Sequence, residues 1–192
     1  MAKEGQRLPR GFTLIELLVT LTLTALLGQL AWTGFADFLA RQRQLTAIAE
    51  VRSLVRFSRF TALGTRQRAT LCALDSSNRC NRDWTGRHIA VFTDSNRNRA
   101  LDANERLHRS LDWPAVRGNL HWRASLGRPY LAFTTAGRSA VNGSFSYCPS
   151  NADARFAAAI VVSHSGRTYV PGDSDGDGTR ETASGRNLSC PL

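Results

Sequence analysis

An apolar run near the N-terminus constrains this chain more than any other feature. Residues 12–30 read FTLIELLVTLTLTALLGQL, about long enough to cross the hydrocarbon core of a membrane as a helix. The basic residues that precede the run are Lys3, Arg7 and Arg10. Positive charge gathers on the cytoplasmic side of membrane segments, so residues 1–11 are expected to stay in the cytoplasm. The sequence therefore predicts a transmembrane segment at 12–32, with the rest of the chain outside the cytoplasm.

One carboxylate, Glu16, interrupts the apolar run. A charge inside a membrane costs several kcal/mol unless it is paired or protonated, so such a residue points to a function. A cleaved secretory signal peptide is one alternative, but its apolar core would hardly carry Glu16, and residues 28–31 make a poor cleavage signal. A simple signal-anchor is the second alternative, and it leaves Glu16 unexplained.

The chain has four cysteines, and none forms a Cys-x-x-Cys pair. This spacing argues against a zinc ribbon or a thioredoxin-like site and predicts two disulfides in an oxidising compartment. Four cysteines allow three connectivities. Proximity in the sequence favours Cys72 with Cys80, which leaves Cys148 to pair with Cys190. Four free thiols in a cytosolic protein are the alternative.

Helical periodicity continues beyond the apolar run. Apolar and small residues recur at spacings of three and four as far as Ala62, which predicts one helix over 12–63 that stops at Gly64. The sequence then changes to short β-branched and aromatic runs separated by turn residues. Strands are predicted at 69–73, 88–92, 106–111, 120–123, 130–134, 144–148, 157–163 and 168–170, with a hairpin turn at 164–167. The predicted fold class is α+β, with a long N-terminal helix and an antiparallel β-rich head at 64–192.

Two loops space oxygen ligands in a way that suits calcium. The stronger candidate set is Asp173, Asp175, Asp177 and Glu181. The weaker, EF-hand-like set is Asp94, Asn96, Asn98, Asp102 and Glu105. In the weaker loop Arg99 stands where an EF-hand has glycine, and two ligands are amides, so affinity should suffer. The alternatives are a solvated acidic loop and a polar hairpin loop with Asx turns.

The net charge of the chain is +10. Almost all of its positive charge is on arginine side chains, because Lys3 is the only lysine. Arg52, Arg56 and Arg59 fall at helical spacing and form a short row. Such a row suits DNA phosphates, with binding that weakens steeply with salt. The alternatives are pairing with acidic faces of neighbouring subunits and plain solvation.

Catalysis finds little support in the sequence. His88, His108, His121 and His164 are scattered among predicted strands, and neither a G-x-S-x-G nor an H-E-x-x-H frame occurs. The chain is therefore interpreted as a non-enzyme.

Residues Gly11-Phe12-Thr13-Leu14-Ile15-Glu16 closely resemble the class III signal of type IV pilins and type II secretion pseudopilins. The resemblance implies that prepilin peptidase removes residues 1–11 by cutting between Gly11 and Phe12, and that Phe12 is then N-methylated. It also implies that Glu16 meets the N-terminal amine of a neighbouring subunit in a filament, which offsets the cost of its charge. The expected location is the inner membrane, single-pass, with a periplasmic head. The expected partners are other minor and major pilins or pseudopilins, prepilin peptidase and the inner-membrane assembly platform.

A second resemblance is to the GspH/FimT group within that family. It is carried by Thr70-Leu71-Cys72, Val91-Phe92-Thr93-Asp94, Phe133-Thr134 and Ser165-Gly166-Arg167. It implies a minor pilin, a structural or priming subunit of a type IV pilus, with an H-type pseudopilin of type II secretion as the alternative. A further alternative is a DNA-binding minor pilin for natural transformation, which uses a Gly-Arg-x-Arg motif. Arg167 and Arg186 each follow a glycine but lack the second arginine.

Overall fold

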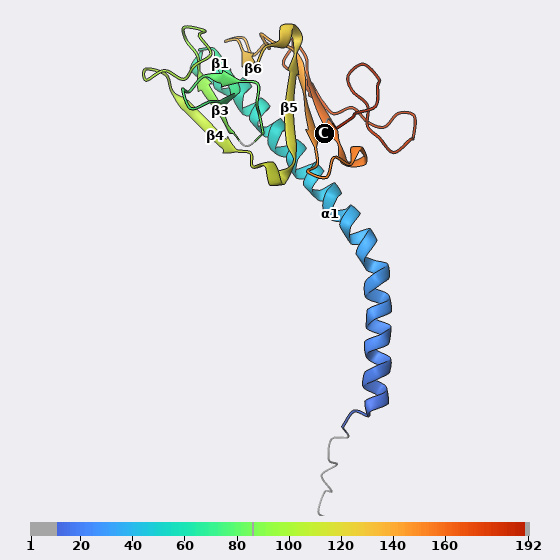
Figure 1. The fold of residues 1–192 in the computed structure, drawn as a ribbon. Coiled ribbons are helices and arrows are strands. Elements are labelled where there is room, and N and C mark those ends of the chain that lie inside the picture. The colour runs from blue at the N-terminus through green and yellow to red at the C-terminus, as the bar shows by residue number, and fades with distance from the viewer. Residues whose placement is uncertain (1–10, 86, 191–192) are drawn as a thin grey trace, which may run out of the picture. The chain divides into compact units, whose positions relative to one another are not determined.

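The computed structural model describes residues 11–85 and 87–190. In this part of the chain one long helix, α1 (Leu14–Thr65), precedes nine β-strands (Figure 1). The chain divides into two compact units. One runs to Leu39, and the other, Ala40–Leu192, contains the rest of α1 and all of these strands. The predicted α+β class is confirmed.

Local hydrogen bonds define both ends of α1. At its start the Thr13 hydroxyl accepts a hydrogen bond from the Glu16 amide at 3.3 Å. At its end the prediction that Gly64 stops the helix is wrong, because α1 continues through Thr65. Arg66 follows with φ 54°, the left-handed conformation that commonly ends a helix. The Thr65 hydroxyl donates to the Thr61 carbonyl at 2.7 Å, which strengthens this last turn.

The strands form two antiparallel sheets. The first has the order β2 (Cys80–Asn81), β1 (Ala69–Leu74), β3 (His88–Thr93), β4 (Leu107–Asp112), with β6 (Tyr130–Phe133) also paired to β1. The second has the order β5 (Asn119–Ala124), β7 (Gly143–Cys148), β8 (Ala158–Val162), β9 (Thr168–Tyr169). Three 3-10 turns lie between strands: η1 (Ala115–Arg117), η2 (Ser125–Gly127) and η3 (Ala154–Phe156). All eight predicted strands are present, and β2 is the strand that the sequence pattern missed.

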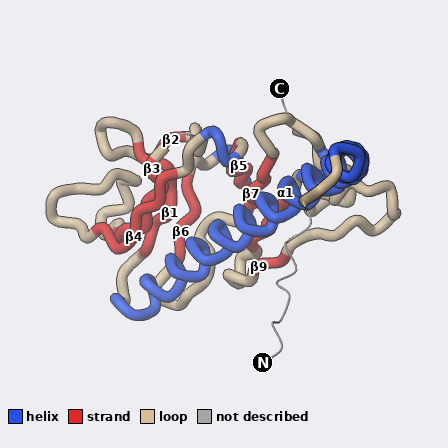
Figure 2. The backbone as a smooth tube through the Cα atoms, turned by 90° about the horizontal axis from the view of Figure 1, so that it is seen from below, coloured by secondary structure: helices blue, strands red, loops and turns tan. Residues whose placement is uncertain are grey.

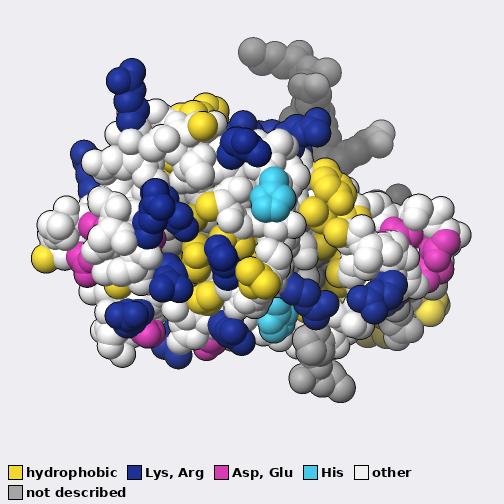
Figure 3. Space-filling model, turned by 90° about the horizontal axis from the view of Figure 1, so that it is seen from above, with side chains coloured by type: hydrophobic (Ala, Val, Ile, Leu, Met, Phe, Trp, Pro, Cys, Tyr) yellow, Lys and Arg dark blue, Asp and Glu magenta, His cyan; other side chains and the backbone are white. Residues whose placement is uncertain are grey.

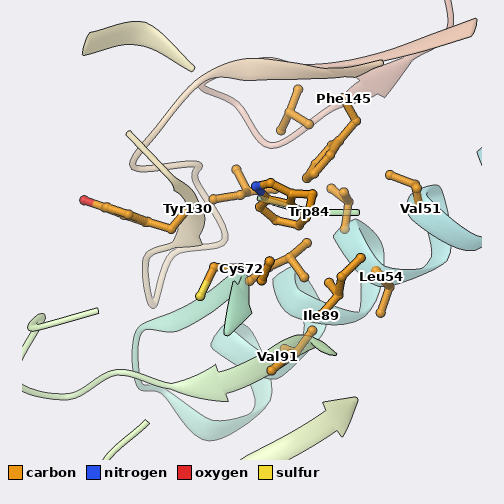
Figure 4. Packing of buried hydrophobic residues seen from close by; sticks show 14 of the residues in the cluster. Val51, Leu54, Cys72, Trp84, Ile89, Val91, Tyr130 and Phe145 are labelled. Atoms are coloured by element: carbon orange, nitrogen blue, oxygen red, sulfur yellow. The ribbon is translucent and has the colours of Figure 1, made fainter. Parts of the chain in front are cut away.

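The C-terminal half of α1 lies against both sheets (Figure 2). Its buried side chains recur every three or four residues, as an amphipathic helix requires. They include Ala47, Val51, Leu54, Val55, Ser58 and Ala62. Trp84, from the loop between β2 and β3, lies among these helix residues and the inner residues of both sheets (Figure 4). One continuous core therefore joins the helix to both sheets.

Both predicted disulfides are present. Cys72 of β1 is bonded to Cys80 of β2, with Cα atoms 5.4 Å apart. Cys148, at the end of β7, is bonded to Cys190 with Cα atoms 5.6 Å apart and a sequence separation of 42. The second disulfide closes a long loop that carries η3, β8, β9 and the acidic C-terminal segment.

Removing the long-range disulfide is expected to destabilise the head more than removing the short one. Replacing Cys148 and Cys190 together with alanine should cost about 4 kcal/mol, against about 2.5 kcal/mol for Cys72 and Cys80, because closing a longer loop removes more entropy from the unfolded chain. Pulse proteolysis across a urea series measures both losses. Equal losses in the two double variants would contradict this ranking.

Candidate assembly and binding sites

The processing motif lies at the start of α1. Gly11 and Phe12 precede the helix, and Phe12 is 84% exposed. A Cβ atom added at Gly11 would meet nothing within 4 Å. The peptide bond predicted to be cleaved therefore lies outside the helix, in open surroundings. The rest of the predicted leader, residues 1–10, lies outside the described residues.

Glu16 has a local role beside the predicted one. Thr13 takes the N-cap position of α1, and Glu16 is the third helical residue, which donates its amide to the Thr13 hydroxyl. Thr-x-x-Glu is the pattern of a capping box, and a carboxylate in the first turn also interacts favourably with the helix dipole. Glutamine serves in the same box. A glutamine substitution therefore separates the charge of Glu16 from its capping role.

The apolar half of α1 contains several threonines whose hydroxyl groups bond to the helix itself. Thr20 and Thr22 donate to the carbonyls of Leu17 and Val19 at 2.9 Å, and Thr24 donates to the Thr20 carbonyl at 2.8 Å. These side chains thus satisfy their donors without an outside partner. In the described part of the chain, no helix combines the length and the hydropathy that crossing a membrane requires. The transmembrane segment at 12–32 stays a prediction.

Three carboxylates of the C-terminal acidic loop lie close together. Oxygen atoms of Asp173, Asp175 and Asp177 lie within 4.8 Å of one another, and all three residues are exposed. The amides of Gly176 and Gly178 donate to Asp173 at 2.7 and 2.9 Å. Desolvation acts to raise the pKa of Asp173, but these hydrogen bonds outweigh it and the net pKa is lowered. Asp173 is therefore held in the charged form that a cation would bind.

Glu181 does not join these aspartates. Its Oε1 atom accepts hydrogen bonds from the Ser174 amide and hydroxyl, both at 2.6 Å, and the residue is buried. These hydrogen bonds from Ser174 lower the pKa of Glu181. Buried Glu181 thus links the end of the acidic loop to Ser174 near its start. Calcium at the three aspartates stays a prediction.

The side chains of the EF-hand-like loop between β3 and β4 bond mainly to one another. The amides of Asn96 and Asn98 both donate to Asp102 Oδ2 at 2.8 Å. Glu105 Oε1 accepts from the Ser95 amide at 2.7 Å. Asp94, at the start of the loop, is fully buried and accepts a hydrogen bond from Thr70 at 2.9 Å.

The backbone of this loop also follows the pattern of a polar hairpin. Asn98 and Ala100 donate their amides to the side chains of Asn96 and Asn98, which are Asx turns. Arg99 adopts φ 64°, the left-handed region that glycine usually occupies in an EF-hand. Within the described residues, the loop's carboxylates do not form a group of three with oxygens in mutual reach. Calcium binding in this loop also stays a prediction.

The structure gathers four of the five arginines predicted to contact DNA or partners. Arg52 and Arg56 line a hollow of about 590 Å³ on the outer face of α1. Arg56, Arg59 and Arg167 line a second hollow of about 640 Å³. The Arg59 guanidinium donates to the Gly166 carbonyl at 3.1 Å, which holds the β8–β9 turn against α1. Arg186 lines neither hollow.

Two residues of this surface escaped the sequence analysis. Phe60 lines both hollows and is 71% exposed, and Arg109 of β4 lines the first. Phe60 lies four residues after Arg56 and so shares the basic face of the helix. An apolar residue at this position is the sequence feature that could have indicated a binding surface. No local sequence pattern indicates Arg109, because it contacts Ser53 of α1 only once the first sheet has folded against the helix.

The histidines do not form a common site. His88 of β3 faces Asp112 of β4, its cross-strand neighbour, and forms an ion pair with it when protonated. His108 lies in β4, His121 in β5 and His164 in the turn after β8. All four cysteines are in disulfides. The histidines therefore lie in three separate strands and a turn, and the cysteines are held in disulfides.

Two family models match the sequence. The model of the type II transport protein GspH matches residues 47–166, and that of the prokaryotic N-terminal methylation motif matches residues 7–28. No curated protein matches the sequence.

Among solved structures, the chain is similar to the type IV minor pilin FimU of Pseudomonas aeruginosa strain PAO1, in two crystal forms. The structure in the P21 form has a sequence 19% identical to this chain and a TM-score of 0.52. The similarity covers 80% of this chain and 99% of the FimU chain. The P65 form is 18% identical with a TM-score of 0.49, over 77% and 99%. At this identity the P21 form supports the fold: a helix followed by antiparallel sheets.

Proposed function

Because this chain belongs to the GspH family of pilins and pseudopilins, we propose that it is a minor pilin that serves as a structural or priming subunit of a type IV pilus. The observation that carries the proposal is the methylation motif at 7–28, which spans the first turns of α1 and includes Glu16. This family consists of structural subunits rather than enzymes, and its members are membrane-anchored, processed by prepilin peptidase and assembled with other pilins.

The proposed sequence of events follows from the N-terminal segment. Prepilin peptidase cuts between Gly11 and Phe12, and the new amine of Phe12 is methylated. The helix holds the subunit in the inner membrane in a single pass, with its head in the periplasm. Glu16, exposed in the first turn of α1, then pairs with the amine of a neighbouring subunit, which favours assembly because it neutralises both charges.

Two features favour a pilus over a type II secretion pseudopilus. The solved structure with the higher TM-score is described as a type IV minor pilin, and the head carries two disulfides and many arginines. The H-type pseudopilin is the second candidate, because the matching family model bears that protein's name. A DNA-binding minor pilin is a further alternative, which the oligonucleotide experiment below tests.

A deletion strain distinguishes the first two candidates. Loss of twitching motility with normal secretion of exoproteins is expected, because the proposed subunit primes the pilus. Complementation with the full-length sequence should restore twitching. Lost secretion with unaffected twitching would assign the chain to the pseudopilus instead.

A further inference from the structure

Two hollows adjoin along the outer face of α1, within the unit Ala40–Leu192. The first is lined by α1 and by Arg109 of β4, and the second by α1 and the turn at 166–168. Arg56 and Phe60 line both hollows, so these two side chains form a ridge between them. We call the two hollows and their ridge the basic groove.

Hydrophobic side chains are exposed in the basic groove although the opposite face of the same helix is buried. Phe60 is 71%, Leu45 50% and Leu63 42% exposed. Phe57 also lines the first hollow, with the Arg109 guanidinium 5.6 Å from the centre of its ring. Contiguous apolar side chains with charged neighbours are typical of a surface that binds a partner.

Positive charge in the basic groove has no carboxylate to neutralise it. Neither hollow is lined by aspartate or glutamate. Ion pairs such as those of Arg87 with Asp83 and of Arg117 with Glu50 involve side chains that line neither hollow. The Arg52 Nε atom is buried without a hydrogen-bond partner in the described structure. Arginine is abundant over the rest of the head as well, and the face in Figure 3 shows basic side chains beside hydrophobic ones and a few acidic ones. The groove therefore complements a ligand that is both acidic and apolar.

We propose that the basic groove is the docking surface for an acidic amphipathic helix of a neighbouring, different subunit. This inference rests on the proposed function as a filament subunit. Arg52, Arg56 and Arg59 span about 10 Å along α1. Carboxylates three and four residues apart on one face of a partner helix have the same spacing as these arginines and can pair with them. Apolar side chains next to those carboxylates would fill the two hollows.

The contents of the groove favour a protein over nucleic acid. Phosphates would satisfy the arginines, and the rings of Phe57 and Phe60 would let bases stack. The other exposed or half-buried apolar side chains, Leu45, Ile48 and Leu63, are aliphatic, so they suit apolar side chains of a protein rather than bases. A different subunit is favoured over a second copy by the acidic residues of α1 itself. Glu16, Asp37 and Glu50 are too widely spaced to share one helical face as neighbours, and Glu50 is paired with Arg117.

Peptide binding to the full-length protein in detergent tests the proposal. The probe is a fluorescent helical peptide with glutamates three and four residues apart and leucines beside them, and its matched control carries glutamine in place of glutamate. Fluorescence anisotropy should give the acidic peptide an affinity at least about tenfold higher than the glutamine peptide. Arg56→Glu with Arg167→Glu should remove about tenfold or more of that affinity. Both arginines are exposed, so the fold is expected to persist.

Arg186→Glu is the matched control, because Arg186 is also exposed but lines neither hollow. Its affinity for the acidic peptide should equal that of the unchanged protein. Equal binding of the two peptides, or equal loss in Arg186→Glu, would overturn the proposal. So would a single-stranded oligonucleotide that binds in place of the acidic peptide and is lost in the Arg56→Glu, Arg167→Glu variant. A deletion strain that fails to twitch while the peptide does not bind would leave the pilus assignment standing and refute the docking surface alone.

Discussion

Replacing Glu16 with glutamine is expected to leave the leader cleaved but to lower incorporation into filaments by about tenfold or more. A neutral side chain has no charge to pair with the amine of a neighbouring subunit, and removing one member of a poorly solvated ion pair leaves the other charge uncompensated. Glutamine keeps the capping box that Glu16 forms with Thr13. The start of α1 should therefore be preserved, and the charge alone is tested.

Immunoblots of the sheared filament fraction and the membrane fraction measure the incorporation. Mass spectrometry of the purified protein reports whether residues 1–11 have been removed and whether Phe12 is methylated. Thr13→Ala is the matched control, because it removes the cap and keeps the charge. Normal incorporation of Glu16→Gln, together with a defect in Thr13→Ala, would show that Glu16 acts through the helix end rather than through assembly.

Secondary structure was largely readable from the sequence, because each element carries a local pattern. The three- and four-residue spacing of small and apolar residues continues to Ala62, and α1 ends three residues later. The end itself was misplaced, since the left-handed residue is Arg66 rather than Gly64. Strand β2 was missed because it has only two residues, which are held by pairing with β1 and by the disulfide of Cys80.

The arrangement of the strands in two sheets was not readable, because pairing depends on contacts between distant segments. Strand β6 pairs with β1, although about sixty residues separate them, and nothing in the local pattern of Tyr130–Phe133 specifies that partner. The basic groove has the same origin. Three of its arginines follow the helical repeat, but Arg109 and Arg167 come from β4 and from the β8–β9 turn.

Trp84 illustrates the same limit in the core. The sequence places it in a polar segment between two strands, among Asn81, Asp83 and Thr85. Asx turns fix this segment, since the amides of Asp83 and Thr85 donate to the side chains of Asn81 and Asp83 at 3.2 Å. The loop thereby directs the indole inward, and Trp84 is only 2% exposed.

Replacing Trp84 with alanine is expected to destabilise the head by about 3–5 kcal/mol, the range for a large side chain deleted from a packed core. The indole packs edge-on against Phe145 with ring centres 5.0 Å apart, and it lies 6.5 Å from the ring of Trp122. Its removal leaves a cavity between α1 and both sheets, which the loop cannot fill. Pulse proteolysis of the full-length protein in a urea series measures the free energy of unfolding.

Trp84→Phe is the matched variant that identifies the cause of this loss. The indole Nε1 is buried without a hydrogen-bond partner among the described residues, so phenylalanine removes volume and an unsatisfied donor but breaks no hydrogen bond. Its destabilisation should therefore be clearly smaller than that of alanine. Leu126→Ala, at a side chain that is 86% exposed, should change stability by less than about 0.5 kcal/mol. If Trp84→Phe destabilised the head as much as alanine does, a polar contact of the indole rather than its packing would hold the helix and the two sheets together.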